Sequence, residues 1–166
     1  ILYLDADIIV MDSLSKLWDF PIGEKAIGAA IDTMAILKGS ALEHIKALQL
    51  PEEHLYFNSG VMLLNLKVLR EIQLLENVKK WTQQHSDLMG NSDQDVLNAI
   101  LTGSVSYFDL RWNLQAPLIA PIKLGWKCSK EHINAVSNPA IIHYITSRKP
   151  WRKEFKIPYQ QLYFEY

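Results

Sequence analysis

The sequence predicts an α/β fold in which a mixed sheet is flanked by helices. Short apolar runs of strand length alternate with stretches whose apolar residues recur at helical spacing, and this alternation is typical of layered α/β domains. Residues 61–66 form an almost continuous apolar run, as expected for a strand that is buried on both faces. The sequence contains no internal repeat and no low-complexity tract, so the pattern indicates one domain over residues 1–166.

The first half of the chain supplies most of the expected strands. Apolar runs that end at aspartate or at turn-forming residues predict strands over 1–4, 8–10, 26–31 and 61–66. Ser13 can cap a short helical turn over 14–18. A longer helix is expected from Ser40 until Pro51, because apolar residues keep helical spacing up to the proline.

The second half is expected to be mainly helical before it returns to strands. Amphipathic spacing predicts helices over 74–85 and 94–101 and strands over 105–110 and 140–144. Ser92 is the expected cap of the second helix. Residues 112–138 have little periodicity and several prolines and glycines, so they are expected to form a long functional loop.

The bulk composition restricts the class of protein. With 166 residues, 49% hydrophobic and 21% charged, the chain reads as a soluble globular domain. The net charge of -1 gives no electrostatic reason to expect nucleic acid as a partner. No apolar run approaches the ~20 residues that a membrane-spanning helix needs. A single cysteine, Cys128, excludes an internal disulfide and favours a reducing compartment such as the cytoplasm.

Both ends of the sequence interrupt expected elements. The chain lacks an initiator methionine, opens within a predicted core strand and stops at Tyr166 in an aromatic stretch. We therefore expect an N-terminal part to be missing, and the C-terminus to be incomplete as well. The first residues have no basic region and no cleavage site, so they do not resemble a signal peptide.

Asp5-Ala6-Asp7 is the first candidate for chemistry. Side chains of an extended segment alternate, so Asp5 and Asp7 are expected to project to the same side. Two neighbouring carboxylates repel unless a cation lies between them. A divalent ion that joins them to a diphosphate would remove that repulsion. A polar strand end with a turn-forming aspartate fits the same spacing, and the spacing alone does not separate the two interpretations.

His143 is the second candidate, at the end of the apolar run 140–142. A histidine at a strand end can be a metal ligand or a buried polar residue with a partner. Arg148 and Lys149 follow closely, and both side chains suit a phosphate chain. Two carboxylates and an imidazole together favour Mn²⁺ over Mg²⁺, which prefers oxygen ligands.

Two further polar motifs precede or begin expected elements. Ser92 and Asp95 have the spacing of a helix-capping pair, which leaves Asp93 and Gln94 free to point into a cleft. Asn58, in Phe57-Asn58-Ser59-Gly60, can both donate and accept hydrogen bonds, as sugar hydroxyls require. A plain turn before the strand over 61–66 explains the latter motif equally well.

The order of the motifs is more specific than any one of them. They run Tyr3-Leu4-Asp5-Ala6-Asp7, Leu14 to Trp18, Ile27-Gly28-Ala29-Ala30-Ile31-Asp32, Phe57-Asn58-Ser59-Gly60-Val61, Leu64-Asn65-Leu66, Asp93-Gln94-Asp95, Leu97-Asn98, His143-Tyr144 and Lys149-Pro150-Trp151. This order resembles family 8 glycosyltransferases over nearly the whole chain, particularly the bacterial lipopolysaccharide galactosyl- and glucosyltransferases and, more distantly, glycogenin. The resemblance implies a GT-A-type nucleotide-diphospho-sugar transferase fold, a Mn²⁺ ion, a UDP-sugar donor and retention of anomeric configuration.

The resemblance also assigns residues to the metal and the diphosphate. It implies that Asp5 and Asp7, as a DxD motif, hold the metal together with His143, and that Lys149 contacts the diphosphate. Relatives often carry a glycine after the histidine whose amide meets the phosphate, and Thr146 stands there in this chain. The backbone N–H survives that change. The N-terminal part that binds uracil and ribose in such enzymes is expected to be the missing one.

A second set of residues is assigned to the sugars. The resemblance implies that Asn58 and Asp93 hold the donor sugar and that Asp32 and Gln94 lie near the acceptor. Gln94 occupies the place of the family's debated nucleophile. A neutral amide is a poor nucleophile compared with a carboxylate, so we favour front-face attack by the acceptor, with Gln94 positioning groups.

The expected activity is the retaining transfer of galactose or glucose from UDP-galactose or UDP-glucose to an oligosaccharide or lipid-linked glycan, such as a lipopolysaccharide or lipooligosaccharide core. Two alternatives remain: a non-catalytic glycan-binding or interaction module, and another metal-dependent phosphate-processing enzyme.

Basic and aromatic residues over 152–166 fit peripheral contact with the inner face of the cytoplasmic membrane. Packing of a C-terminal helix explains them equally well.

Overall fold

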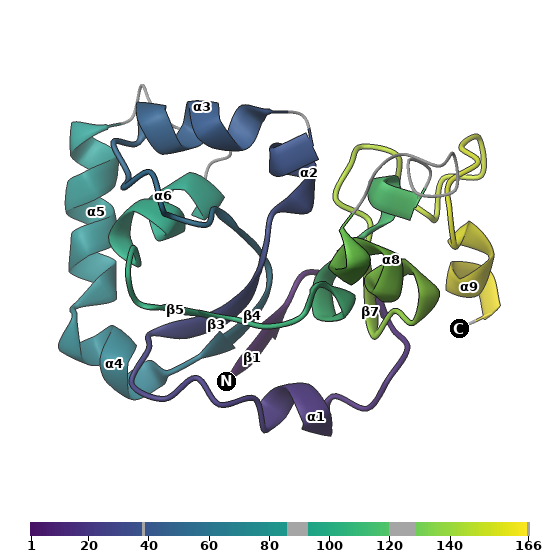
Figure 1. Ribbon diagram of the computed structural model, residues 1–166, viewed down its shortest axis with the longest axis horizontal. Helices are drawn as coiled ribbons and strands as arrows, with labels where there is room; N and C mark the ends of the chain where they lie inside the picture. Colours follow the sequence, from purple (N-terminus) through teal and green to yellow (C-terminus); the bar gives the residue numbers. More distant parts are fainter. Residues whose placement is uncertain (38, 86–92, 120–128, 166) are drawn as a thin grey trace. The chain divides into compact units, whose positions relative to one another are not determined.

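The computed structural model of the protein describes residues 1–37, 39–85, 93–119 and 129–165 (Figure 1). The chain divides into two units by its internal contacts. The first contains Ile1–Tyr3 and Phe20–Phe108, and the second contains Leu4–Asp19 and Asp109–Tyr166. The expectation of one domain over residues 1–166 stays a prediction.

The first unit is built on a four-stranded mixed sheet. Its strands, in spatial order, are β1 (Leu2–Leu4), β4 (Phe57–Leu64), β3 (Ile27–Ile31) and β5 (Val105–Tyr107). Strand β3 is antiparallel to β4, with Ile27 opposite Leu64, and parallel to β5, with Ile27 opposite Val105. The helices of this unit are α2 (Thr33–Leu37), α3 (Ser40–Ala47), α4 (Leu66–Glu71), α5 (Leu74–Gln84) and α6 (Asp93–Ile100).

The central strands of the first unit carry its core. One cluster of buried residues comprises Ala26, Ile27, Ala29, Phe57, Met62, Leu69 and Leu101, and a second comprises Ala35, Ala41, Ile45, Leu48 and Tyr56. Seven of the eight residues of β4 are buried, which confirms the prediction of a strand that is covered on both faces. The burial of β4 extends to Asn58 and Ser59, so these polar side chains need partners inside the protein.

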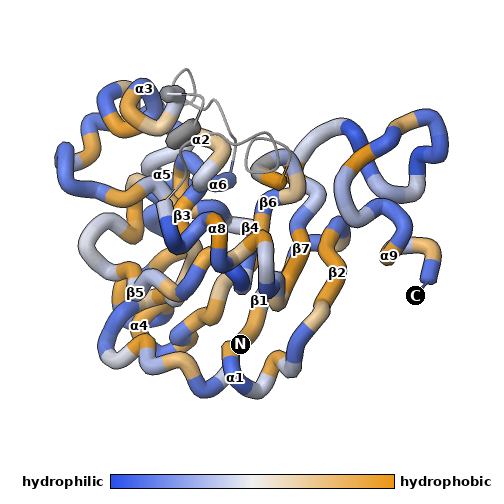
Figure 2. Tube along the Cα trace, turned by 45° about the vertical axis from the view of Figure 1, so that its right-hand side comes forward, coloured by the Kyte–Doolittle hydropathy of each residue, from blue (hydrophilic) through white to orange (hydrophobic). Residues whose placement is uncertain are grey.

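The second unit contains a three-stranded mixed sheet. Its strands, in spatial order, are β2 (Ile8–Val10), β7 (Ile141–His143) and β6 (Leu114–Gln115). Strand β7 is antiparallel to β2 and parallel to β6, and His143 lies opposite both Ile8 and Gln115. Both β2 and β7 are coloured mainly as hydrophobic in Figure 2. The helical segments are α1 (Ser15–Trp18), η2 (Leu110–Asn113), η3 (Ala116–Leu118), α8 (Lys130–Ser137) and α9 (Gln160–Glu165).

The predicted α/β class with mixed strand directions is therefore confirmed, with the strands distributed over two sheets. Among the described residues, no helix has the length and apolar character that crossing a bilayer requires.

Two predicted boundaries differ from the structure for identifiable reasons. The helix that begins at Ser40 ends at Ala47 rather than near Pro51, because Gln49 adopts a left-handed φ of 54°. The amides of Gln49 and Leu50 then donate to carbonyls of the last helical turn, as in a Schellman cap. The strand predicted over 61–66 begins at Phe57 instead, so the turn interpretation of residues 57–60 is wrong.

The predicted loop over 112–138 is wrong for much of its length. It contains part of η2, all of β6 and η3, and helix α8. Helix α8 begins after Ser129, whose hydroxyl accepts a hydrogen bond from the amide of His132 and so caps the helix. Residues 120–128, with Cys128, lie outside the described residues.

The predicted helix caps have different outcomes. Leu14 rather than Ser13 occupies the N-cap position of α1 and has no side-chain capping bond. Ser13 Oγ still accepts a hydrogen bond from the amide of Ser15 at 3.4 Å. Ser92, the expected cap of α6, lies outside the described residues.

Gly28 in β3 illustrates how closely the first unit is packed. A Cβ atom at this position would lie 2.9 Å from Ile22 Cγ2 and 3.5 Å from ring atoms of Phe20 and Phe108. The two phenylalanine rings contact each other edge to face, with centroids 5.7 Å apart. A larger residue would therefore have to displace a side chain of a packed core.

We expect Gly28→Val to lower the free energy of unfolding by about 1–3 kcal/mol, the usual cost of overpacking, as measured by urea denaturation. Ile22→Ala removes the nearest obstacle, so the same substitution should cost less in the Ile22→Ala background. Equal costs in the two backgrounds would show that contact with Ile22 is not the cause.

Candidate functional site

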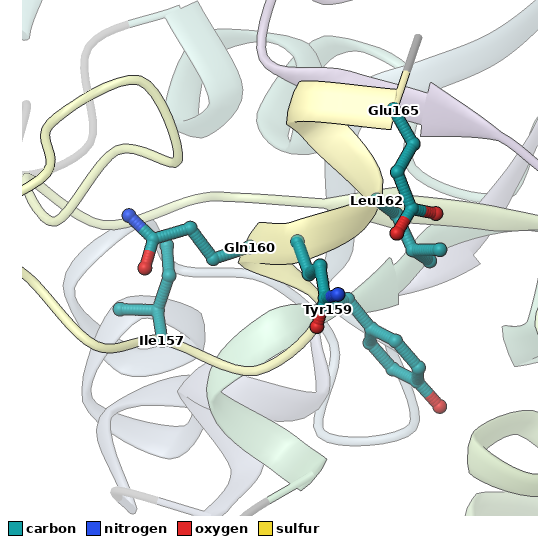
Figure 3. Close-up of a pocket in the computed structure, with 6 residues that line it drawn as sticks. Ile157, Tyr159, Gln160, Leu162 and Glu165 are labelled. Atoms are coloured by element: carbon teal, nitrogen blue, oxygen red, sulfur yellow. The ribbon is translucent and has the colours of Figure 1, made fainter.

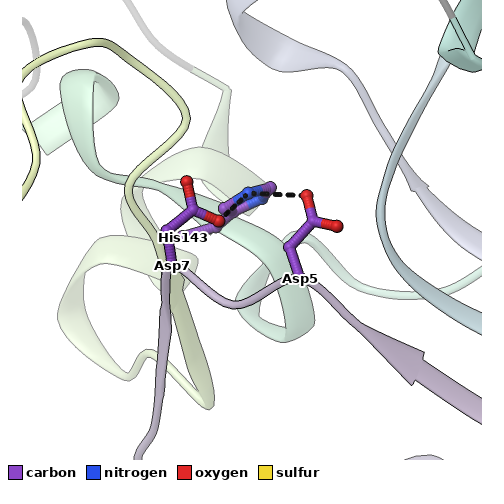
Figure 4. A group of neighbouring side chains, drawn as sticks. All are labelled: Asp5, Asp7 and His143. Carbon is purple, nitrogen blue, oxygen red and sulfur yellow. Dashed lines mark ion pairs between the residues drawn. The ribbon is translucent and has the colours of Figure 1, made fainter.

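Asp5, Asp7 and His143 converge within the second unit (Figure 4). The antiparallel pairing of β2 with β7 places Ile8 opposite His143. The amide of Tyr144 donates to the carbonyl of Asp7 at 2.9 Å, so the hydrogen bonds between the two segments extend to the residue before β2 and the residue after β7. As a result, one ligand atom from each of the three side chains lies within 4.8 Å of the others.

The three side chains form a charged cluster of graded exposure. His143 Nε2 is 3.4 Å from Asp5 Oδ2 and 3.3 Å from Asp7 Oδ1. The His143 side chain is 3% exposed, Asp7 16% and Asp5 35%. Lys149 Nζ donates to Asp7 Oδ2 and, at 2.7 Å, to the carbonyl of Tyr144. The structure thus brings Lys149 to the residues that the sequence singled out as metal ligands.

The protonation equilibria of the cluster favour charged groups. Burial raises the pKa of Asp7, but hydrogen bonds and charges of His143 and Lys149 outweigh it and lower the pKa to about 2. Burial lowers the pKa of His143, but Asp5 and Asp7 outweigh it and raise the pKa above its ordinary value. The site therefore holds Asp7 in its ionised form and stabilises positive charge beside it.

This donor set fits a divalent cation. The two carboxylate oxygens and Nε2 face one another, and the other ring nitrogen, Nδ1, is 2.9 Å from Asn113 Oδ1. Carboxylate and imidazole ligands together suit Mn²⁺ and similar borderline ions. Asn113 did not emerge from the sequence, because it lies in the stretch that was predicted to be a loop.

A second polar network lies in the first unit, around Gln94 at the start of α6. Gln94 Oε1 accepts hydrogen bonds from the amide of Ser59 at 3.1 Å and from Asn58 Nδ2 at 3.0 Å. Gln94 Nε2 donates to Asp32 Oδ2 at 2.9 Å. Because a backbone N–H can only donate, its bond to Oε1 fixes the orientation of the amide and directs Nε2 toward Asp32.

The other oxygen of Asp32 has a structural role of its own. Asp32 Oδ1 accepts from the amide of Ala35 at 2.8 Å, in the first turn of α2. The structure therefore brings together Asp32, Asn58 and Gln94, three of the residues assigned to the sugars. The oxygen of Gln94 already holds two donors, and this favours a positioning role for Gln94 over a nucleophilic one.

Asp95 has partners that sequence reasoning missed. Its side chain is fully buried, and its Oδ1 accepts a hydrogen bond from Tyr56 Oη at 2.5 Å and lies 3.2 Å from His44 Nδ1. The expected pairing of Asp95 with Ser92 falls partly outside the described residues. Tyr56 and His44 stack on each other at 5.2 Å, so Asp95 joins α6 to α3 and to the start of β4.

Asn98 holds α6 against β4. Its Oδ1 accepts from the amide of Phe57 at 2.9 Å, and its Nδ2 donates to the carbonyls of Phe57 and Gln94. His54 Nε2 is 3.0 Å from the same Oδ1. The Leu97-Asn98 motif of the sequence was therefore a usable sign of this anchor, which keeps Gln94 beside Asn58.

The remaining assigned residues lie apart from these contacts. Asp93 is exposed at the first position of α6. Thr146 Oγ1 accepts a hydrogen bond from the amide of Arg148 at 3.2 Å. The roles assigned to Asp93 at the donor sugar and to Thr146 at the phosphate stay predictions.

Comparison with known proteins decides the family. A model of glycosyl transferase family 8 matches residues 1–154. The chain belongs to glycosyl transferase family 8. The match confirms the resemblance that the order of the motifs indicated.

Similar family 8 sequences come from several bacteria. General stress protein A of Bacillus subtilis is 32% identical over 172 residues, which cover 99% of this chain and 57% of the relative. Lipopolysaccharide 1,2-glucosyltransferase of Escherichia coli is 27% identical over 157 residues, which cover 92% of this chain and 44% of the relative. The chain thus spans about half the length of these curated relatives.

A solved family 8 structure has the same fold. The galactosyltransferase LgtC, in complex with donor and acceptor sugar analogs, is 30% identical and superposes with a TM-score of 0.82, covering 99% of this chain and 59% of LgtC. The predicted GT-A-type fold is confirmed by this similarity.

The Gln94 network predicts that the substitution Gln94→Glu destabilises this chain in a pH-dependent manner. In Gln94→Glu, a carboxylate oxygen replaces the donor that faces Asp32, so two anions oppose each other at neutral pH. We expect urea denaturation to show a loss of about 1–3 kcal/mol in the free energy of unfolding at pH 8. The pair retains one proton to a higher pH than either carboxylate alone, so the loss should shrink as the pH falls to 5.

Gln94→Met is the uncharged control: it removes the hydrogen bond to Asp32 as Gln94→Glu does, together with the two bonds that Oε1 accepts, and adds no charge. Its loss of stability should be similar at both pH values. If the loss of stability in Gln94→Glu is also the same at both pH values, the proposed repulsion between Glu at position 94 and Asp32 is wrong.

Proposed function

We propose that the protein is a retaining, Mn²⁺-dependent glycosyltransferase that moves galactose or glucose from a UDP-sugar to a glycan acceptor such as a lipopolysaccharide core. The observation that carries the proposal is the convergence of Asp5, Asp7 and His143, with ligand atoms within 4.8 Å of one another. Lys149 beside this cluster supports the diphosphate as the bound group, since an ammonium is a common phosphate partner.

Asp5, Asp7 and His143 would hold the metal. When bound, a divalent cation supplies Lewis-acid stabilisation of the charge that develops on departing UDP. The imidazole among the ligands favours Mn²⁺ over Mg²⁺, which prefers oxygen ligands. Lys149 has to exchange part of its contact with Asp7 for phosphate oxygens, and its flexible side chain permits that exchange.

Asn58 and Asp93 are proposed to hold the donor sugar, and Asp32 and Gln94 to lie near the acceptor. The hydrogen-bonded arrangement of Asp32, Asn58 and Gln94 supports the roles of these three residues, and the role of Asp93 rests on the resemblance. Gln94 would position its neighbours without bonding to the sugar, since both of its amide groups are engaged. Front-face attack by the acceptor hydroxyl is then the route consistent with retention.

The two rival functions have less support. Two neighbouring carboxylates repel each other unless a cation lies nearby. A glycan-binding module has no need of such a pair beside a buried imidazole. A nuclease or phosphatase often uses a second metal. Among the described residues, Asp5, Asp7 and His143 are the one group of three or more His, Cys, Asp or Glu with metal-ligand spacing.

A donor screen of the full-length protein with Mn²⁺ tests the activity. UDP release should be seen with UDP-galactose or UDP-glucose and should increase when a truncated lipopolysaccharide core is added. Preferred hydrolysis of a nucleotide diester would instead favour the phosphate-processing enzyme. Glycan binding without Mn²⁺ and without turnover would favour the binding module.

Asp7→Asn should remove most of this activity without unfolding the protein. Loss of a charged metal ligand weakens metal binding and transition-state stabilisation, so we expect a decrease in turnover on the order of 100-fold or more. The measurement is UDP release at saturating Mn²⁺, together with a thermal denaturation curve.

Asp19→Asn is the matched control, because Asp19 is an exposed aspartate of the same unit and should retain parental turnover. Unchanged turnover in Asp7→Asn would be incompatible with the assigned metal centre.

Peripheral contact with the inner face of the cytoplasmic membrane is a further part of the proposal. Trp151 and Phe164 are 45% and 53% exposed, and the rings of Trp151 and Tyr163 lie 5.9 Å apart. Arg152 and Lys153, both exposed, directly follow Trp151 in the sequence. Aromatic and basic side chains together suit an anionic bilayer surface.

In a flotation assay, the full-length protein should float with vesicles that contain anionic phospholipid, and Trp151→Ser should weaken this binding. Leu75→Ser, at a 74% exposed position of α5, is the control. Absence of flotation would end the membrane proposal and leave the transferase proposal unaffected.

A further inference from the structure

The ring of His143 has a second polar partner besides the carboxylates. Asn113 Oδ1 is 2.9 Å from His143 Nδ1, and the two residues are 1% and 3% exposed. A carboxamide oxygen can only accept a hydrogen bond, so this contact requires the proton to be on Nδ1. In a neutral ring, Nε2 then carries the lone pair.

That lone pair faces the candidate metal centre. Nε2 is the ring atom that lies 3.3 Å from Asp7 Oδ1 and 3.4 Å from Asp5 Oδ2. The opposite tautomer would turn the lone pair of Nδ1 toward the oxygen of Asn113, two acceptors at hydrogen-bond distance. Asn113 therefore favours the Nδ1–H tautomer, in which Nε2 is able to bind a metal.

We propose that Asn113 is a positioning residue of the metal centre, which fixes the ring orientation of His143 and its Nδ1–H tautomer so that Nε2 is presented as a ligand. The proposal rests on the metal-dependent function proposed above. Ligating histidines commonly donate their second N–H to a carbonyl or carboxylate, and loss of such a partner typically costs about 10–100-fold in metal affinity.

The fold holds Asn113 through its backbone. Asn113 is the last residue of η2, which begins with a capping bond from the amide of Arg111 to Asp109 Oδ1 at 2.8 Å. Directly after Asn113, β6 pairs with β7, and Gln115 lies opposite His143. The strand that directly follows Asn113 therefore lies beside, and parallel to, the strand that carries His143.

Arg111 ties the same segment to the residues that follow β2 and to those that precede β7. Arg111 Nη2 is 2.9 Å from Asp12 Oδ2, and Arg111 Nε donates to the carbonyl of Asn138 at 3.0 Å. The amide of Ala140 donates to the carbonyl of Arg111 at 2.8 Å. These bonds limit the movement of η2 relative to the strand that carries His143, as a positioning role requires.

The test uses three variants of the full-length protein. Asn113→Leu keeps the approximate size but cannot accept a hydrogen bond. Asn113→Asp keeps an acceptor at the same place and is the rescue variant. Asn134→Leu makes the same change at an exposed position of α8 and is the matched control. Circular dichroism and thermal denaturation establish that each variant folds, and Asn113→Ala replaces Asn113→Leu if the latter does not.

The first readout is Mn²⁺ affinity by calorimetric titration. We expect about 10–100-fold weaker binding for Asn113→Leu, and affinity near that of the parent for Asn113→Asp and Asn134→Leu. Equal affinities of Asn113→Leu and the parent would overturn the proposal. An Asn113→Asp variant that binds as weakly as Asn113→Leu would overturn it as well, since the acceptor would then not be what matters.

The second readout does not depend on metal or activity. Imidazole ¹⁵N chemical shifts, assigned with His143→Gln and recorded on metal-free protein at a pH where the ring is neutral, report the tautomer directly. In the parent and in Asn113→Asp, the acceptor at position 113 should keep the proton on Nδ1. In Asn113→Leu, Asp5 and Asp7, which face Nε2 at 3.4 and 3.3 Å, should shift it toward Nε2. A parent with Nε2–H, or a variant with unchanged tautomer, would overturn the role of Asn113.

The two readouts separate this inference from the proposed function. If the parent binds no Mn²⁺, the proposed metal centre is wrong, whereas the ¹⁵N shifts still decide whether Asn113 sets the tautomer. If the parent binds Mn²⁺ and the tautomer is the same in Asn113→Leu, the metal centre stands and the inference about Asn113 fails.

Discussion

The antiparallel pairing of β2 with β7 is the constraint on which the candidate metal centre depends. Asp7 and Lys149 are 142 positions apart in the sequence, and they meet because this pairing joins the beginning of the chain to its end. The register is what matters. With Ile8 opposite His143, the imidazole projects toward the aspartates, and a shift by one residue would turn it to the opposite face of the sheet. The short strand β6 adds to the constraint by pairing with β7 on its other side.

Features with a clear period or a continuous apolar run could be predicted from sequence. The burial of residues 61–63 follows from strand geometry. Asp5 and Asp7 do converge, as the spacing suggested, but they do so in a bend between β1 and β2 rather than in an extended strand. The short elements η2 and β6 could not be predicted, because they are too short for any period to be measured and no distinct apolar run marks them. The end of α3 depends on the left-handed backbone of Gln49, and glutamine has no special preference for that conformation.

The candidate site shows the same division. The acidic pair is visible in local spacing, but its link to His143 came only from the resemblance, since no local pattern joins residues so distant in sequence. Asn113 could not be identified from the sequence, because its hydrogen bond to His143 joins residues that are distant in the sequence. In the other unit, the polar residues at the start of β4 looked like a turn, yet they are buried with partners on α6 and at the start of α2. The burial of the Asn58 carboxamide and the Ser59 amide is tolerable because both have hydrogen-bond partners.

The graded exposure of the three charged side chains gives the cluster a direction. Asp5 is open to water, Asp7 is largely covered, and His143 is enclosed by its own sheet and by Asn113. Among the described residues, the carboxylates are thus the exposed side of the cluster. An ion that arrives from that side would exchange its first waters for carboxylate oxygens and a later one for the imidazole.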